Sequence, residues 1–413
     1  MDLLRNMDSL RIKKSRRKVS IRMNTQEKFV ILGGGTAGYN AVAEVRKRNK
    51  TASIMLVSDE AKLPYLRTML TKAMLADFAE EHMTISPKKW YEENQIQILL
   101  ETKAVAIDAE NKKVSVEGKY QNKVEIDYDK LIVALGAHSF VPPIKGADGP
   151  RVVTIRNVND IARIKSLLKQ ATDAVIIGGG VLGLEAACQL IKANLKVTVI
   201  ENQERLLPRQ LDPESSERLA KALEAKGLNF VTNGGISEIT DHSVELVNGE
   251  SLPANLVIIS TGVRPNLEVA KTAGIEIDRS IVVDSHMRTN IPDIYACGDC
   301  ASFQGVNYSL WSEATAMGKV AGANAAGEEM EYKLEGYPLL FIEPGISLYV
   351  VGDTKSEPLE DKKIVEMKDE GKGAIEKLFF DKDILVGAII LGDLSKGKKW
   401  AEKVKEKMTY QEL

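Results

Sequence analysis

Two stretches of this 413-residue chain decide its fold, and they repeat one pattern. The first reads Lys28-Phe-Val-Ile-Leu-Gly33-Gly-Gly35-Thr-Ala-Gly38, and the second reads Asp173-Ala-Val-Ile-Ile-Gly178-Gly-Gly180-Val-Leu-Gly183. Each is a short apolar run, then glycines spaced G-x-G-x-x-G, then a segment typical of a helix, at 39–47 or 184–193. A second apolar run follows each helix, at 52–57 and 196–200. The sequence therefore predicts two strand–turn–helix–strand units.

The glycine spacing has a physical meaning in this context. The first glycine allows a tight turn, the second lets the backbone approach a pyrophosphate, and the third lets the helix pack closely on the strand. The free N–H groups and the dipole of the helix N-terminus then favour the bound anion. Both units thus indicate Rossmann-type dinucleotide sites. The expected contact residues are Gly33, Gly35, Thr36, Ala37 and Gly38 in the first unit, and Gly178, Gly180, Val181, Leu182 and Gly183 in the second.

An acidic residue follows the second strand of each unit. Glu201 comes 18 residues after Gly183, where a carboxylate can accept both ribose hydroxyls of NAD and would repel a 2′-phosphate. This favours NADH over NADPH. In the first unit Ser58-Asp59-Glu60 follows the strand, where the sequence does not fix the register, and Glu60 is our choice for the adenosine ribose. The alternative in each case is a solvated loop residue. Two dinucleotide sites in one chain indicate hydride transfer from a nicotinamide to a flavin.

Composition excludes several classes of protein. Fifty-six Lys and Arg oppose 58 Asp and Glu, so overall charge gives no support for nucleic-acid binding. No apolar run approaches the length of a membrane span. Three cysteines rule out a disulfide framework and fit a reducing, cytoplasmic compartment, and the four histidines show no metal-ligand spacing. Residues 1–22 carry a local charge of +6, and we expect residues 1–27 to be a disordered basic tail or an upstream start, with Met23 as the natural initiator.

Three further segments resemble the FAD-dependent pyridine nucleotide–disulfide oxidoreductase superfamily. They are Tyr128-Asp-Lys-Leu-Ile-Val-Ala-Leu-Gly136, with Leu135 in place of the usual Thr, then Thr261-Gly262-Val-Arg-Pro-Asn266, and Ile291-Pro-Asp-Ile-Tyr-Ala-Cys-Gly298-Asp299-Cys300. The resemblance covers roughly residues 28–400 and favours the branch of NADH:rubredoxin reductases, ferredoxin reductases and the flavin module of nitrite reductases.

The resemblance implies an α/β fold with two Rossmann-like domains and a small α+β C-terminal domain. FAD would bind to 28–140 together with 266–330, and an NAD-binding domain would be inserted at 141–265. Pro142-Pro143, Arg264-Pro265 and Gly336-Tyr337-Pro338 mark the joins. The C-terminal domain would span 331–413, with strands at 377–380 and 384–391 and a Lys-rich helix at about 399–407.

The resemblance also implies the roles of particular residues. Asp299 would bond a ribityl hydroxyl of FAD, and Trp311 would cover part of the flavin ring, although a lone Trp also fits core packing. Arg67 and Lys72 would stand near the flavin, where a cation stabilises the reduced form. Lys72 would be buried and paired with Glu185, although a solvated helix lysine is the alternative, and we assign these two residues to catalysis. Ala104, Gly136 and Gly262 complete the expected cofactor-binding set.

The cysteine pair that the superfamily's disulfide reductases carry is missing, because the segment Lys62-Leu-Pro-Tyr65-Leu-Arg67-Thr-Met-Leu-Thr-Lys72 has none. Disulfide, peroxide and thiol-assisted oxygen reduction are therefore disfavoured. Cys297-Gly-Asp-Cys300 is a C-x-x-C, but it coincides with the FAD motif, and Cys188 reads as a small buried hydrophobe.

We expect an NADH-dependent FAD oxidoreductase that passes electrons to a separate rubredoxin or ferredoxin, with no resident metal, nucleic acid or membrane partner. A ferredoxin reductase, an NADH oxidase reducing oxygen at the flavin, and a redox-dependent signalling flavoprotein are the alternatives.

Overall fold

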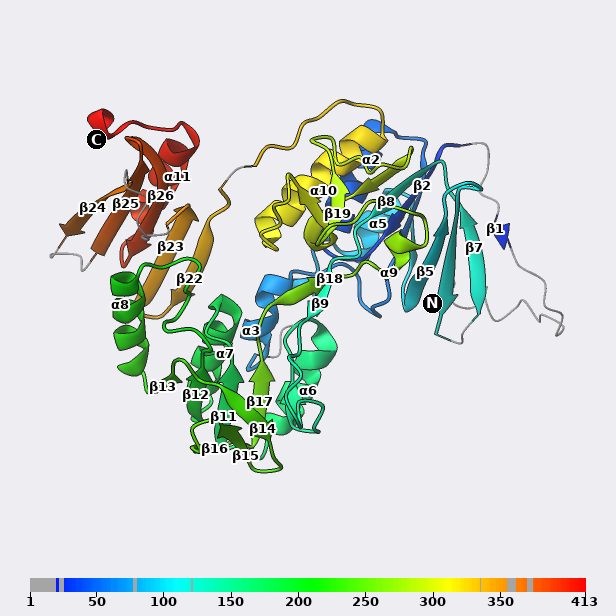
Figure 1. Ribbon diagram of the computed structural model, residues 1–413. Helices are drawn as coiled ribbons and strands as arrows, with labels where there is room; N and C mark the ends of the chain where they lie inside the picture. The colour runs from blue at the N-terminus through cyan, green and yellow to red at the C-terminus, as the bar shows by residue number, and fades with distance from the viewer. Residues whose placement is uncertain are drawn as a thin grey trace.

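The computed structural model describes residues 20–21, 26–76, 80–119, 122–334, 336–354, 362–369 and 374–413. Figure 1 shows two units built around parallel sheets and a third, C-terminal unit. The first parallel sheet has the strand order β20-β8-β2-β3-β4. Its strands are β2 (Lys28–Leu32), β3 (Ser53–Val57), β4 (Ile96–Leu99), β8 (Lys130–Val133) and β20 (Ile294–Ala296).

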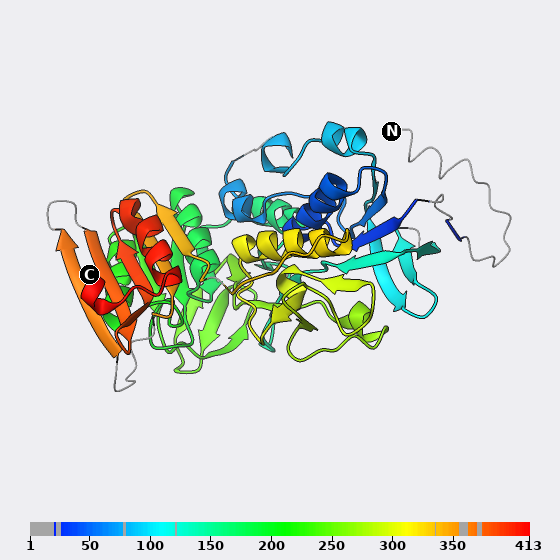
Figure 2. The same cartoon turned by 90° about the horizontal axis from the view of Figure 1, so that it is seen from above.

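Two helices pack together beside this sheet. They are α2 (Thr36–Arg48), which follows the first glycine motif, and α10 (Trp311–Ala325). A Cβ placed on Gly318 would lie 2.4 Å from the Ala37 carbonyl oxygen, and one on Gly322 would lie 2.5 Å from that of Ala41. The two glycines therefore allow the helix backbones to approach closely, and Figure 2 shows α10 in yellow alongside α2 in blue.

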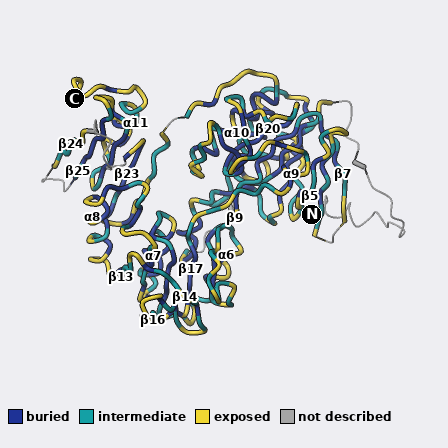
Figure 3. The backbone as a smooth tube through the Cα atoms, in the orientation of Figure 1, coloured by how far each residue is buried: buried dark blue, intermediate teal, exposed yellow. Residues whose placement is uncertain are grey.

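The second parallel sheet repeats the first, with the order β10-β17-β11-β12-β13. Its strands are β10 (Val152–Val153), β11 (Asp173–Ile177), β12 (Lys196–Ile200), β13 (Leu228–Val231) and β17 (Leu256–Ile259). Helices α6 (Val158–Leu168), α7 (Val181–Lys192) and α8 (Pro213–Glu224) belong to this unit. All strand residues of β17 and most of β11 are buried, as expected for a parallel sheet covered on both faces, and Figure 3 shows these strands in dark blue.

Each parallel unit also carries a small antiparallel sheet. In the first it is β5 (Thr102–Asp108), β6 (Lys113–Gly118) and β7 (Lys123–Asp127), and in the second it is β14 (Ile236–Ile239), β15 (Ser243–Leu246) and β16 (Ser251–Pro253). Ser20–Ile21, which the sequence placed in a disordered tail, forms β1 and pairs with β7 in parallel. Met23 and most of that tail lie outside the described residues.

The chain passes between the two parallel units through β9 (Ala137–Ser139) and β18 (Val263–Pro265), which pair antiparallel. The domain limits drawn at 140/141 and 265/266 stay predictions at residue level, and they fall beside this pair. Because β9 follows β8 and β18 follows β17, this pairing holds the carboxyl ends of β8 and β17 close to each other.

The C-terminal unit is a five-stranded antiparallel sheet with the order β22-β23-β26-β25-β24. Its strands are β22 (Leu339–Glu343), β23 (Ile346–Gly352), β24 (Lys362–Asp369), β25 (Ala374–Asp381) and β26 (Ile384–Leu391). Helix α11 (Gly397–Lys405) packs on one face through Trp400, and the expected helix begins two residues later than this one. The other face places Phe341, Leu348 and Phe379 in one core with residues of α7 and α8.

No helix among the described residues is long and apolar enough to cross a membrane.

Candidate functional site

The first glycine motif forms a turn that only glycine fits well. Gly33 has φ of +114°, and a Cβ there would lie 2.1 Å from the Ala134 carbonyl oxygen. A Cβ on Gly38 would lie 2.0 Å from the Gly33 carbonyl oxygen. Gly35, the N-cap of α2, has no heavy atom within 4 Å of its Cβ position. The turn therefore packs tightly on two sides and is open where a pyrophosphate would approach.

The second motif has the same geometry. Gly178 also has φ of +114°, and a Cβ there would lie 2.3 Å from the Ser260 carbonyl oxygen. A Cβ on Gly183 would lie 2.2 Å from the Gly178 carbonyl oxygen. Gly180, the N-cap of α7, again has no heavy atom within 4 Å of its Cβ position. Val181 and Leu182 begin α7, as Thr36 and Ala37 begin α2. The chain thus holds two similar open turns, each at a helix N-terminus.

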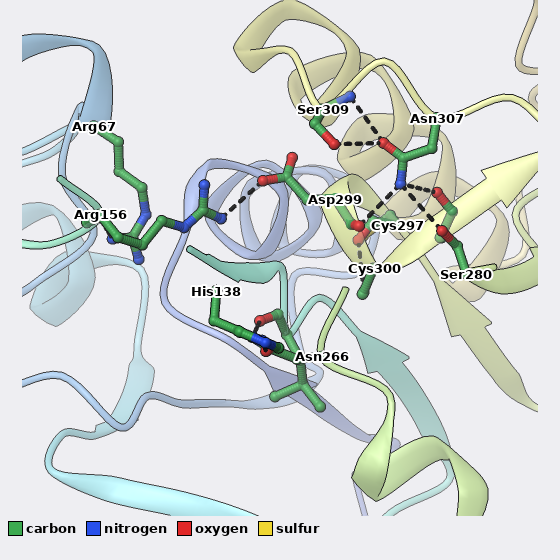
Figure 4. Close-up of polar contacts among 12 residues, drawn as sticks. Arg67, His138, Arg156, Asn266, Ser280, Cys297, Asp299, Cys300, Asn307 and Ser309 are labelled. Carbon is green, nitrogen blue, oxygen red and sulfur yellow. Dashed lines mark hydrogen bonds and ion pairs between the residues drawn. The ribbon is translucent and has the colours of Figure 1, made fainter. Parts of the chain in front are cut away.

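Beside the first turn, three charged side chains from distant segments meet (Figure 4). Asp299 lies in the single-turn helix η2 (Gly298–Cys300), and its carboxylate accepts a hydrogen bond of 2.8 Å from the Arg156 guanidinium. The Arg156 carbonyl oxygen in turn accepts one of 2.6 Å from Arg67. Arg156 Nε is buried and has no hydrogen-bond partner among the described residues. Such an unpartnered donor is costly unless a ligand supplies an acceptor.

The structure fixes the register after β3, which the sequence left open, and it favours Ser58 over Glu60 at the ribose position. Leu32 pairs with Val57 in the first unit, and Ile177 pairs with Ile200 in the second, so the position equivalent to Glu201 is Ser58. Ser58 is buried, and its hydroxyl would lie 2.5 Å from a Cβ on Gly34.

The Glu60 carboxylate is already engaged elsewhere. It accepts a hydrogen bond of 2.6 Å from the Tyr65 hydroxyl and forms an ion pair with Arg67. The pKa of Arg67 is raised, because its interactions with Tyr65 and Glu60 outweigh the desolvation that comes with burial. The Glu60 carboxylate therefore holds Arg67 in place, and Ser58 is the residue that directly follows β3.

The expected burial of Lys72 is wrong, and the described residues contain no ion pair between Lys72 and Glu185. Lys72 is exposed on α3 (Leu70–Ala73). The residue before it, Thr71, is 2% exposed and donates its hydroxyl to Glu185 across 2.9 Å. Burial raises the pKa of Glu185, while the Thr71 hydrogen bond and the Lys72 charge lower it. Lys72 therefore acts on Glu185 only at a distance, and Thr71 makes the direct contact between α3 and α7.

Beside the second turn, Glu201 directly follows β12. Its carboxylate accepts the backbone N–H of Gly179 at 2.8 Å and that of Gln203 at 2.9 Å. A pocket of about 350 Å³ opens next to it at the carboxyl end of β13, lined by Val231, Thr232, Asn233, Gly234, Gly235, Leu246, Val247 and Asn248. In open α/β sheets, ligands bind outside the carboxyl ends of the strands.

The other expected residues lie around these two turns. Trp311 is the first residue of α10 and is 45% exposed, so it is not core packing. Gly136 follows β8 near Arg156, Gly262 precedes β18, and Ala104 is buried within β5. Glu313, two residues after Trp311, is 3% exposed, and burial raises its pKa to about 7.

The three cysteines are free and buried in this arrangement. Cys297 and Cys300 have no exposed surface, and burial raises the pKa of the Cys300 thiol to about 11. Cys188 is buried in α7, where burial raises its thiol pKa to about 12. Among the described residues, no group of three or more His, Cys, Asp or Glu could hold a metal ion.

Sequence reasoning missed Arg156, Thr71 and Ser58. Arg156 stands one residue before the capping box Asn157–Asp160 of α6, which marks a helix start but not a ligand contact. Only the tertiary structure brings it to Asp299. The open turn at Gly35, the carboxylate of Asp299 and the unpartnered Nε of Arg156 together fit the phosphates and hydroxyls of FAD.

Comparison with known proteins identifies the family of the chain. Residues 27–318 match the pyridine nucleotide-disulphide oxidoreductase family, and residues 344–408 match the rubredoxin NAD⁺ reductase C-terminal domain. The chain is 33% identical over 373 residues to an NADH-rubredoxin oxidoreductase of Clostridium acetobutylicum, covering 90% of this chain and 93% of that protein.

A nitrite reductase [NAD(P)H] of Bacillus subtilis is also 33% identical, over 91% of this chain, but this chain spans only 46% of its length. A solved NAD-dependent persulfide reductase from A. fulgidus superposes with a TM-score of 0.88 at 26% identity, covering 94% of this chain and 78% of that one. The family match alone covers well over half of the sequence. The chain belongs to the pyridine nucleotide-disulphide oxidoreductase family, whose members bind FAD and use NADH.

Proposed function

We propose that this chain is an NADH-dependent FAD oxidoreductase that delivers electrons singly to a small rubredoxin-type iron carrier protein. The observation that carries the proposal is the C-terminal match at 344–408 to the rubredoxin NAD⁺ reductase domain, together with the similarity over nearly the full length of the clostridial NADH-rubredoxin oxidoreductase. Three free, buried cysteines fit a reducing compartment, and we place the protein in the cytoplasm.

In this proposal, the turn at Gly35 and the N-terminus of α2 hold the FAD pyrophosphate. Asp299 accepts a hydrogen bond from the ribityl chain, and Arg156 turns its free Nε toward the cofactor. When bound, FAD accepts a hydride and releases the two electrons one at a time. Arg67, fixed by Glu60 and Tyr65, keeps a positive charge close to that site.

NADH occupies the second turn. Gly180 faces its pyrophosphate, Glu201 binds the adenosine ribose, and the pocket beside β13 receives the adenine. Thr71 orients the Glu185 carboxylate at the start of α7, where the nicotinamide enters between the two parallel units. Two carrier molecules then accept one electron each, and one proton leaves to solvent for every NADH oxidised to NAD⁺.

The cysteine positions separate this function from thiol chemistry. The persulfide reductase likeness concerns the fold, but here no cysteine exists between Lys62 and Lys72. The two thiols nearest the FAD turn, Cys297 and Cys300, are buried, and their raised pKa values keep them protonated at neutral pH. A disulfide or persulfide substrate would find no thiolate to attack it.

The test is anaerobic. The purified holoprotein is mixed with NADH while the flavin absorbance is followed, and oxidised rubredoxin is then added. We expect bleaching, followed by catalytic reduction of rubredoxin. Bleaching without rubredoxin reduction would refute the acceptor and direct the assay to ferredoxins and oxygen. Bleaching with NADPH but not NADH would refute the role of Glu201.

A further inference from the structure

Several polar contacts attach the C-terminal sheet to the unit that carries the second glycine motif, and two of them centre on buried charged side chains. In the first, the Lys377 ammonium on β25 lies 3.1 Å from the Asp212 carboxylate and 2.7 Å from that of Glu214, both at the N-terminus of α8. In the second, Glu343 on β22 accepts hydrogen bonds from Lys192 at 2.7 Å and Gln189 at 3.1 Å, near the C-terminal end of α7. Figure 1 shows α8 directly beside this sheet.

The first contact reaches a segment that the NADH site depends on. Residues 202–212 connect Glu201 to α8, and Asp212 caps that helix through the N–H of Ser215. The Ser216 hydroxyl in α8 donates to the Leu206 carbonyl oxygen at 2.8 Å. The Leu207 N–H donates to the Gly179 carbonyl oxygen at 3.3 Å. The segment therefore runs from the proposed ribose carboxylate, past the second motif, to the helix that Lys377 holds.

A second residue of the C-terminal unit binds the same segment. Thr354 is 3% exposed, and its hydroxyl donates to the Gln210 carbonyl oxygen across 2.7 Å. The C-terminal unit thus fixes the segment at Gln210 and at Asp212. By contrast, Glu343 touches α7 at the end opposite to Gly180.

The burial of Lys377 indicates that this ion pair fixes a position and does not merely hold two surfaces together. Its side chain is only 5% exposed, and the Asp212 side chain only 6%. Burying two charges is unfavourable, and their attraction offsets the desolvation only when the geometry is well fixed. Apolar residues often give equal or better adhesion. Desolvation opposes the charge on both groups, but hydrogen bonds from Ser215 and Lys377 hold the Asp212 pKa below its usual value, and those to Glu214 and Asp212 raise the Lys377 pKa, so both groups stay charged. A charged, buried pair specifies the position of the α8 N-terminus.

We infer that Lys377 is a positioning residue for NADH binding: from the C-terminal unit, it fixes the segment 202–212 against Gly179 and so presets the Glu201 carboxylate for the ribose. This inference rests on the NADH site proposed above. It gives the C-terminal unit a role in binding the electron donor, in addition to any role with the acceptor.

The test compares Lys377→Met with Glu343→Gln in the FAD-loaded protein. The dissociation constant and the limiting rate come from stopped-flow flavin bleaching at increasing NADH, and NAD⁺ affinity comes from calorimetry. We expect Lys377→Met to weaken both ligands about tenfold while the limiting rate changes by less than about twofold, because a preset site is lost and the reacting groups are not. Glu343→Gln lowers the melting temperature but leaves both affinities within about twofold.

Hydrogen exchange supplies a readout that does not depend on turnover. The backbone amides of Leu207 and Leu211 should exchange faster in Lys377→Met than in Glu343→Gln, since only the first variant frees the segment. If Lys377→Met does not fold, Thr354→Val removes the other contact with little change in volume, and we expect NADH affinity to fall about threefold.

Three results separate the possibilities. Unchanged NADH affinity in Lys377→Met, or an equal loss in Glu343→Gln, overturns the inference, because the contact is then general adhesion. If Glu201→Ala also leaves NADH affinity unchanged, the proposed NADH site itself is wrong. If Glu201→Ala weakens NADH and Lys377→Met does not, only the inference fails.

Discussion

The substitution Gly180→Ala adds a single methyl group, which should leave the protein folded but weaken its binding of NADH. Gly180 has φ of −80° and ψ of 173°, a conformation open to any residue, and its Cβ position has no heavy atom within 4 Å. Replacing glycine by alanine at such a site restricts the unfolded chain, so the free energy of unfolding should rise by about 0.5 kcal/mol. The added methyl group nevertheless stands where the proposed site places the NADH pyrophosphate.

The expected loss of binding follows from the hydrogen bonds that the methyl group displaces. A hydrogen bond to a charged group contributes about 2 kcal/mol, which corresponds to a roughly thirtyfold weaker dissociation constant for NADH. Gly183→Ala provides the contrast, because its Cβ would lie 2.2 Å from the Gly178 carbonyl oxygen. That variant should lose about 2–4 kcal/mol of stability, since backbone on both sides must shift.

The assay measures flavin bleaching against NADH concentration, with thermal melts as the folding control. Gly35→Ala is the matched variant in the first turn, and it should lower FAD content while the protein remains folded. The reasoning is refuted if Gly180→Ala folds normally and binds NADH as tightly as the original protein. In that case the open turn at α7 does not face the pyrophosphate.

Three other predictions follow from the site. Glu201→Ala should lower the ratio of NADH to NADPH affinity about tenfold, because a carboxylate repels the 2′-phosphate; equal losses for both nucleotides in binding titrations would contradict this. Asp299→Asn and Arg156→Met should each release FAD during gel filtration, monitored by the ratio of flavin to protein absorbance, and full retention in both would oppose the proposed FAD contacts. Burial raises the pKa of Glu313 to about 7, from 4.5 in the unfolded chain, so the folded protein binds the extra proton between these values. Stability should therefore fall as pH rises from about 4.5 through 7, and Glu313→Gln should flatten that decline in thermal melts; an unchanged slope would show that another group titrates.

The parts of the fold that follow from local pattern were predictable. Strands β2 and β12 have the limits read from their apolar runs, and both glycine turns have the geometry that their spacing requires. Strand β26 also matches the expected range, because an apolar run bounded by turn residues fixes both of its ends. In each case the residues that decide the structure are neighbours in the chain.

The structure differs from the sequence-based assignments where the outcome depends on register or on a contact between distant segments. Thr71 and Lys72 are adjacent on a helix, and successive residues there point about 100° apart, so one faces α7 and the other faces solvent. Ser58 and Glu60 differ by two positions after a strand, where no periodicity marks the end. The contact between Arg156 and Asp299 joins residues 143 positions apart, which no local pattern reveals.

The duplicated units differ in a way that suits their two ligands. At equivalent positions the first unit has neutral Ser58 and the second has Glu201. The proposed FAD contacts come from three distant segments, the turn before α2, Arg156 and Asp299, so releasing FAD requires these segments to separate. The proposed contacts of the NADH pyrophosphate and ribose, at Gly180 and Glu201, lie within one unit and one adjoining loop, so these contacts break without separating the two parallel sheets. The two proposed sites thus account for one cofactor that is retained and one that exchanges, and the positioning role that we infer for Lys377 supports the exchanging site from outside it.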